Sequence, residues 1–255
     1  MNRALSSALL QWQLAWRAEV GRRASFLLQL LFMCINDLAW VVFWLLVFSH
    51  RDAIRGWDRA EVLVLFAIVT FTYGIGIGMF YGVRRLGERI RRRELDPWLA
   101  QPQPIVLRVL FSRIHPPLLG DLVFGPVLFA LAGSNTPGAW LRYIGVALLA
   151  SAIITAFLLA TESLTFWLDT GSEFAGVAFT AITVLSTYPA SIYSGVVKLV
   201  VFTIVPAAFI GSVPAEVVLD PSARLVGMLV LAAVASWVVA LSVFHLGVRR
   251  YLRVG

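Results

Sequence analysis

Long apolar segments divide this sequence, and they restrict the folds that are open to it. Residues 25–48, 61–83, 117–133, 141–168 and 224–246 carry almost no charge, and one more apolar stretch covers residues 174–213. An α-helix needs about 20 apolar residues to cross the hydrocarbon core of a bilayer. Only 14 % of the residues are charged, against about 25 % in soluble domains. The sequence therefore predicts an all-α membrane protein, with one transmembrane domain over residues 1–255.

The stretch 174–213 is too long for one straight helix and short for two helices with a loop. Pro189, Pro206 and Pro214 interrupt it or follow it, and Lys198 lies between them. Proline removes a backbone donor and breaks a helix. Irregular backbone survives at membrane depth only where protein or water covers it. We expect one crossing here, followed by a broken, re-entrant segment on the outer side over residues 188–220, which makes six transmembrane helices in all.

The positions of the basic residues predict the orientation. Of 21 Arg and Lys residues, four precede residue 24, eight lie between residues 84 and 113, and three follow residue 248. Cytoplasmic loops carry an excess of Arg and Lys, so both termini and the loop 84–116 are predicted to lie in the cytoplasm. The membrane is predicted to be the inner (cytoplasmic) membrane of the cell. Two full crossings within 174–213 would export the C-terminal arginines. The net charge of +7 indicates anionic membrane lipid as a partner, and not nucleic acid.

The N-terminal segment, residues 1–22, is predicted to be an amphipathic helix. Leu5, Leu9, Trp12, Trp16 and Val20 recur at spacings of three and four. Such a stripe favours a helix that lies in the cytoplasmic membrane interface. The alternative is a helix packed on the bundle.

Glycines in the second span indicate close helix packing. Gly74, Gly78 and Gly82 are four residues apart, and small residues at this spacing allow two helices to approach closely. The run GIGIG is not a dinucleotide-binding loop, because it follows no strand and lies within a predicted membrane helix.

Three ionisable residues in apolar stretches are candidates for an intramembrane polar site: Asp37, Glu162 and Lys198. A charge at this depth is costly and is a functional hypothesis by default. The alternative for Asp37 is a structural hydrogen bond inside the bundle.

Other readings apply to the carboxylates nearer the cytoplasm. Asp121 and Glu162 lie towards the cytoplasmic ends of their spans, where snorkelling or pairing with Arg108 or Arg113 would explain them. The three histidines are scattered without metal-ligand spacing, so no metal site is predicted. Nor does the sequence contain a nucleophile, base and orienting group at plausible membrane depth, or a P-loop for ATP.

The cytoplasmic loop contains an unusual stretch, RRRELDPWLAQPQP, at residues 91–104. Residues 94–101 are predicted to form a short helix, because Glu94 and Asp96 suit the positive end of a helix and Pro97 suits its first turn. Leu95, Trp98 and Leu99 would then cluster on one side, and Pro102 and Pro104 would end the helix. A plain positively charged loop is the alternative, but it leaves the apolar cluster and the prolines unexplained.

Residues 90–102, IRRRELDPWLAQP, resemble the signature I-x-x-G-E-L-D-x-x-L-x-x-P of ABC-2-type transporter permeases. Arg93 stands where that family commonly has Gly. Tyr188-Pro189, the run IVPAAF at 204–209 and the run VPA at 213–215 are similar to the family's second conserved region. The resemblance extends over essentially the whole chain.

The resemblance implies the permease subunit of an ATP-driven transporter, usually an exporter. Two separate ATPase subunits would bind ATP and Mg²⁺, so this chain is expected to hold no cofactor and not to be an enzyme by itself. A second permease, identical or related, would pack against the first and fifth spans. The short helix would be the family's coupling helix, with Glu94, Leu95, Asp96, Trp98 and Leu99 docked on an ATPase. The alternatives are a non-transporting membrane scaffold or sensor and an intramembrane enzyme.

Overall fold

The computed structural model describes residues 2–101, 103–133 and 135–254, with the side chains of residues 2–5 and 254 left out. Pro102, one of the predicted helix stops, falls outside this part. The elements in chain order are α1 (Asn2–Val20), α2 (Arg23–Phe48), β1 (Ala53–Ile54), β2 (Trp57–Asp58), α3 (Arg59–Tyr73), the π-helix η1 (Gly74–Met79), the 3₁₀-helix η2 (Tyr81–Arg85), α4 (Leu86–Arg91), α5 (Asp96–Leu99), α6 (Ile105–Phe111), α7 (Pro116–Leu119), α8 (Asp121–Ala132), α9 (Pro137–Ser163), the 3₁₀-helix η3 (Leu164–Phe166), α10 (Gly171–Ser186), the 3₁₀-helix η4 (Ala190–Ile192), α11 (Gly195–Phe202), the 3₁₀-helix η5 (Ala207–Phe209), α12 (Ser212–Leu219) and α13 (Ala223–Val254).

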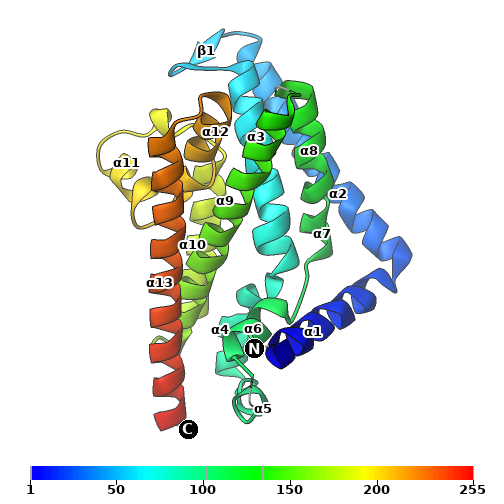
Figure 1. Cartoon of the computed structure of the whole chain (residues 1–255), viewed down its shortest axis with the longest axis vertical. Coiled ribbons are helices and arrows are strands. Elements are labelled where there is room, and N and C mark those ends of the chain that lie inside the picture. Colours follow the sequence, from blue (N-terminus) through cyan, green and yellow to red (C-terminus); the bar gives the residue numbers. More distant parts are fainter. Residues whose placement is uncertain (1, 102, 134, 255) are drawn as a thin grey trace.

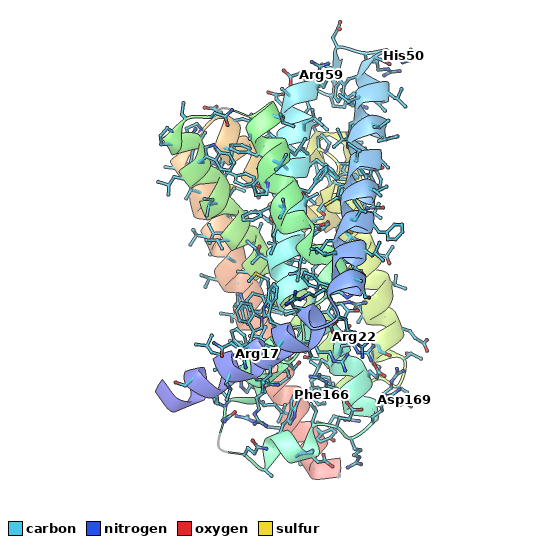
Figure 2. The ribbon with its side chains drawn as sticks, turned by 90° about the vertical axis from the view of Figure 1, so that its right-hand side faces the viewer. Arg17, Arg22, His50, Arg59, Phe166 and Asp169 are labelled. Carbon is cyan, nitrogen blue, oxygen red and sulfur yellow. The ribbon has the colours of Figure 1, made fainter. Side chains whose placement is uncertain are left out.

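The long helices run side by side, as Figure 1 shows. α3 packs against α8 and α9, and α9 packs along α13. The antiparallel pair β1–β2 caps one end of the bundle. Figure 2 shows His50 and Arg59 at that end and Phe166 and Asp169 towards the other, where both chain ends lie in Figure 1.

Burial separates a central helix from the peripheral ones. In the most apolar part of α3 with η1, 78 % of residues are buried, against 17 % in α2 and 17 % in α13. Leu31, Phe32 and Leu46 of α2 are more than half exposed, as expected of helices whose outer faces meet lipid or another subunit.

Asp58 caps the N-terminus of α3 with a capping box. Its Oδ1 accepts from the Glu61 N–H at 2.8 Å, and Glu61 Oε2 accepts from the Asp58 N–H at 2.9 Å.

Four helices in the described part of the chain are long and apolar enough to cross a membrane, and there are up to six if each bent pair counts as one span. The four are Arg23–Phe48, Arg59–Met79, Pro137–Phe166 and Ala223–Arg253. The bent pairs are Ile105–Phe111 with Pro116–Ala132, at 79°, and Gly195–Phe202 with Ala207–Leu219, at 56°. The chain is therefore an all-α membrane protein.

The stretch after α9 is broken at its prolines. α10 ends at Ser186, just before Tyr188-Pro189, and α11 ends at Phe202, before Pro206. Tyr188 turns back onto α2, where its ring lies 5.7 Å from that of Trp44 and 6.5 Å from that of Trp40. The first break therefore packs against the first span.

The second span differs from the continuous α-helix predicted over 61–83. The α-helix ends at Tyr73, and GIGIGM at Gly74–Met79 forms a π-helix. The backbone leaves helical geometry at Phe80 (φ −118°, ψ 35°) before η2 begins. π-Helical turns are rare and occur often at functional sites, so the part of this span that leads into η2 is a candidate functional segment.

α1 contacts the bundle through one side. The Trp12 indole N–H donates to the Met79 carbonyl at 3.1 Å, and its ring lies 6.3 Å from that of Phe111 in α6. Leu9 and Val20 of the predicted stripe stay exposed, as do Leu10 and Leu14. The contact face is therefore centred on Ala8 and Trp12, and not on the whole predicted stripe.

Candidate functional site

Residues 91–101, called the charged tip below, project from the end of the bundle near both chain ends. Figure 1 shows α5 at this end, below α4 and α6. The helical part is one turn, Asp96–Leu99, with Pro97 at its start, and is shorter than the predicted helix over residues 94–101. The tip therefore forms a compact turn that directly follows α4.

The backbone of Arg93 sets the direction of the charged tip. Arg93 has φ +58°, in the left-handed region that costs a non-glycine residue free energy. The Glu94 N–H donates to the Arg89 carbonyl at 3.0 Å, and the Arg93 N–H donates to the Ile90 carbonyl at 3.2 Å. These two bonds form the Schellman motif that ends α4. A glycine suits this position best, so the geometry explains why Gly would be common here and shows that Arg93 keeps the turn.

The apolar side chains of the charged tip divide into two groups. Leu95 is fully buried in this chain's own core, which corrects the expectation that its side chain faces a partner. Trp98 and Leu99 are half-buried against that core. Glu94 and Asp96 are exposed. Leu95 is thus an anchor, whereas the other four predicted docking residues remain accessible wholly or in part.

Arg89 connects Trp98 to α6. Its guanidinium lies 4.5 Å from the centre of the Trp98 ring and donates to Ser112 Oγ at 2.7 Å. Burial, and second the positive charge of Arg113, lower the pKa of Arg89 to about 10. It stays charged at neutral pH, so the cation–π contact with Trp98 persists.

The last helix also touches the charged tip. The Tyr251 hydroxyl of α13 donates to Asp96 Oδ1 at 2.5 Å, and the Arg93 guanidinium lies 5.5 Å from the centre of the Tyr251 ring. Residues 155 positions apart in the sequence therefore meet here.

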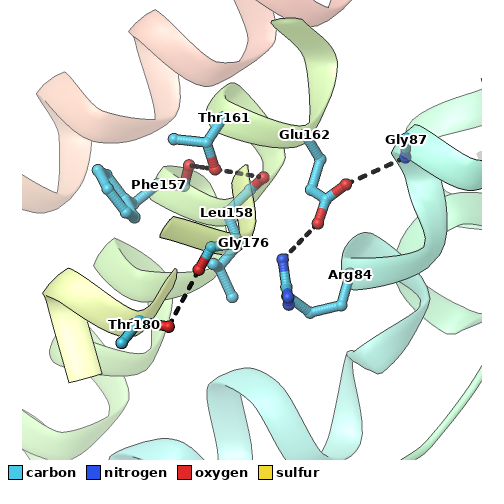
Figure 3. A network of polar contacts seen from close by, with 8 residues as sticks. All are labelled: Arg84, Gly87, Phe157, Leu158, Thr161, Glu162, Gly176 and Thr180. Carbon is cyan, nitrogen blue, oxygen red and sulfur yellow. Dashed lines mark hydrogen bonds and ion pairs between the residues drawn. The ribbon is translucent and has the colours of Figure 1, made fainter. Parts of the chain in front are cut away.

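A buried ion pair joins the base of the tip to two spans. Arg84 Nη1 lies 2.5 Å from Glu162 Oε1 of α9, and the Gly87 N–H donates to Glu162 Oε2 at 3.1 Å (Figure 3). The same guanidinium lies 4.3 Å from the centre of the Phe179 ring in α10. Glu162 thus pairs with Arg84, and not with Arg108 or Arg113 as the sequence suggested. This contact, called the Arg84–Glu162 joint below, connects η2 and α4 with α9 and α10.

Asp37 meets a different carboxylate. Asp37 of α2 and Asp121 of α8 line one cavity. Asp121 is fully buried and has no ion pair among the described residues, so the predicted pairing with Arg108 or Arg113 is wrong. Lys198 is exposed on α11. The three predicted polar residues therefore do not form one site.

The three glycines of the second span lie against different neighbours. A Cβ at Gly74 would come within 2.7 Å of Leu122, and one at Gly78 within 3.2 Å of the Leu118 backbone. A Cβ at Gly82 would collide with the carbonyl oxygen of Val109 in α6. A side chain at Gly74 or Gly82 would therefore force a neighbour to move, and one at Gly78 would need a small shift of the Leu118 backbone.

Several site residues were not predicted. Arg84 and Arg89 were counted only as positive charges, and Tyr251 was not singled out. The sequence held one signal for the position of Asp121. No basic residue lies three or four positions from it, so a carboxylate at that depth needs a partner from another helix. Among the described residues, no group of three or more His, Cys, Asp or Glu could hold a metal ion.

Comparison with known proteins adds one finding. A family model described as ABC-2 family transporter protein matches residues 34–255. Neither the curated proteins nor the solved structures contain a match. The matched range includes the carboxylate pair, the charged tip and the Arg84–Glu162 joint.

Proposed function

This chain belongs to the ABC-2 transporter family, and we propose that it is the membrane-spanning permease subunit of an ATP-driven exporter. In this proposal it crosses the cytoplasmic membrane six times, with α1 in the inner interface and both termini in the cytoplasm. Separate ATPase subunits bind ATP and Mg²⁺. The observation that carries the proposal is the family match over residues 34–255.

The charged tip is the proposed ATPase-docking surface. It combines exposed carboxylates at Glu94 and Asp96 with the half-buried side chains of Trp98 and Leu99. Carboxylates form strong charge-assisted hydrogen bonds to basic or backbone donors, and a central aromatic residue often dominates a small interface. Arg91 and Arg92, which are exposed, are assigned to the anionic lipid of the inner leaflet.

The Arg84–Glu162 joint supplies a route from the charged tip to the spans. A push on α5 would reach α4 through the contact between Trp98 and Arg89. From α4 it would reach α9 through the Gly87–Glu162 hydrogen bond, and from the adjoining η2 it would reach α10 through the Arg84–Phe179 contact. Packed elements transmit small displacements because protein interiors are dense. ATP-driven closure of the ATPases would therefore move α9 and α10.

A second permease, identical or related, is proposed to pack on α2 and α10, which correspond to the predicted first and fifth spans. Both helices present apolar side chains outwards, including Leu31 and Phe32 of α2 and Val177 of α10. Cysteine pairs along these two helices should form intersubunit disulfides. Cross-links confined to α8 and α9 would contradict this seam.

Docking is tested by purification of the chain together with a co-expressed candidate ABC ATPase subunit. Trp98→Ala and Leu99→Asp should reduce ATPase recovery about 30-fold, the effect of losing about 2 kcal/mol at an interface anchor. Trp167→Ala is the matched control, because Trp167 is another partly exposed tryptophan outside the tip.

Both tip variants should still insert into the membrane. Normal ATPase recovery and ATP-driven transport in both would show that the charged tip is not the docking surface. A chain that recruits no ATPase at all, even with the natural tip, would favour the scaffold or sensor.

A further inference from the structure

We propose that the cavity between α2, α3, α8 and α10 binds the ammonium group of an amphipathic cationic substrate. This inference rests on the permease role proposed above and assigns the substrate class. Asp37 and Asp121 supply the negative charge, and aromatic rings from neighbouring helices supply the rest of the site.

The carboxylate pair is buried, and three of its four oxygens lack a hydrogen-bond donor among the described residues. Asp121 is 0 % exposed and Asp37 is 2 % exposed. Both oxygens of Asp121, and Oδ2 of Asp37, accept no hydrogen bond from the described part of the chain. None of the described residues that line the cavity is basic. Ionised carboxylates that are buried without donors are costly, and two of them facing one cavity repel each other, so the pair without a ligand favours taking up a proton. A bound cation would replace that proton and remove both penalties.

The cavity has the size and lining of a site for an organic cation. Its volume is about 190 Å³, and Trp40, Phe66 and Tyr73 line it together with Asn36 and the two carboxylates. Aromatic faces attract ammonium groups, and aromatic residues combined with carboxylates are a common way to recognise them. A bare metal ion would fill little of this volume and would leave the three rings without a role.

An apolar groove adjoins the cavity along α10. It is an open face of this one helix, with Val177, Ala181 and Leu185 along it and Glu173 at one end, and it shares Val184 with the cavity. It belongs to the side of α10 assigned above to the second permease, so a ligand tail here would lie at the seam between the two permeases. A ligand with its cationic head between the carboxylates could extend an alkyl tail past Val184 into this groove. Charge in the cavity and apolar surface beside it together match an alkylammonium ion.

The test measures equilibrium binding of radiolabelled octyltrimethylammonium to the full-length purified chain in lipid nanodiscs. This probe is a permanent cation, and octanol serves as an uncharged competitor with the same tail. Asp37→Asn and Asp121→Asn should each weaken binding about tenfold or more, as expected when a charged contact becomes neutral. Asp169→Asn is the matched control, because Asp169 is exposed in the loop before α10 and its removal should leave the affinity unchanged.

Selectivity in the natural protein keeps the test independent of variant folding. Excess octanol should not displace the probe, and neither should sodium chloride at a concentration that saturates a sodium site. Displacement by octanol would show that the probe binds only through its apolar tail. Displacement by sodium would show an inorganic cation site. Either result, or unchanged binding in both Asn variants, overturns the proposal. Because the ATPase is absent from this assay, its failure leaves the permease role standing and is distinguishable from failure of ATPase recruitment.

Discussion

At the scale of single residues, Arg93 shows how one backbone angle shapes the charged tip. Its φ of +58° ends α4 and sends the chain into α5. The side chain offsets part of the cost by its contact with Tyr251.

Arg93→Gly should raise the free energy of unfolding by up to about 1 kcal/mol, because glycine adopts the left-handed region without strain. Thermal melting of the purified protein in detergent measures this. Arg93→Ala is the control, since it removes the same ring contact and keeps the strain, and it should melt at or below the natural protein. A glycine variant that melts below the alanine variant would contradict the explanation.

The buried pair Arg84–Glu162 should contribute more than the exposed pairs on the same helix. Glu162→Ala leaves a guanidinium that is 18 % exposed without its carboxylate, and an unpaired buried charge costs about 3 kcal/mol. Glu88→Ala removes the partner of Arg85 and Arg92 at a site where the arginines are 41 % and 64 % exposed, and should cost less than about 1 kcal/mol. Melting temperatures of the two variants, compared side by side, check the order. Equal losses would show that burial does not strengthen the Glu162 contact.

At the scale of elements, close backbone approach sets the path of the second span. η1 and η2 lie against α6, α7 and α9 with glycine at the contact points. These contacts hold the lower half of the span against the helices that carry the charged tip.

Gly82→Ala should destabilise the protein by about 1–3 kcal/mol, because overpacking forces the backbone to shift and the new Cβ meets the Val109 carbonyl and Ser112 Oγ. Gly145→Ala is the matched control in α9, where a Cβ meets nothing within 4 Å. It should be neutral or stabilise by about 0.5–1 kcal/mol. Both are measured as thermal stability in detergent. A Gly82→Ala variant as stable as the control would show that α6 can shift to accommodate the added methyl group without loss of stability.

The sequence predicted most of the elements but few of their contacts. Apolar runs identified the long helices, and prolines identified the breaks around Pro189 and Pro206, because both signals are local in the chain. The π-helix at Gly74–Met79 and the pairing of Asp37 with Asp121 depend on neighbours from distant segments, which no periodicity reports. The burial of Leu95 was missed for the same reason, since an apolar residue in a short helix can face its own core or a partner.

At the scale of the whole molecule, the distribution of basic residues and the arrangement of the elements indicate the same orientation in the membrane. The arginine-rich loop, the charged tip and both chain ends lie at one end, and the β1–β2 hairpin lies at the other (Figure 1). On the positive-inside rule, we expect the first of these ends to lie in the cytoplasm.

In a Cys34→Ser background, a cysteine at Arg253 should react with a membrane-impermeant maleimide only after the cells are permeabilised. A cysteine at Asp52, which is exposed near the hairpin, should react in intact cells and is the control. Gel shifts of the labelled protein report both. Reaction at position 253 in intact cells would overturn the assignment of six crossings.

The π-helix in the second span has a consequence for how the length of this chain can vary. A π-turn holds an additional residue relative to an α-turn, so loss of one residue within Gly74–Met79 would allow the α-helix to continue. Each α-helical residue turns the chain by about 100° and advances it by about 1.5 Å, and the widened π-turn takes up its additional residue within about the rotation and rise of one α-turn. The deletion would therefore leave Arg84 facing Glu162, whereas a deletion within the regular α-helix Arg59–Tyr73 would rotate Arg84 away and carry the turn at Arg93 around with it. In evolutionary terms, loss of one residue should be tolerated within Gly74–Met79 and selected against within Arg59–Tyr73, although both belong to the same span.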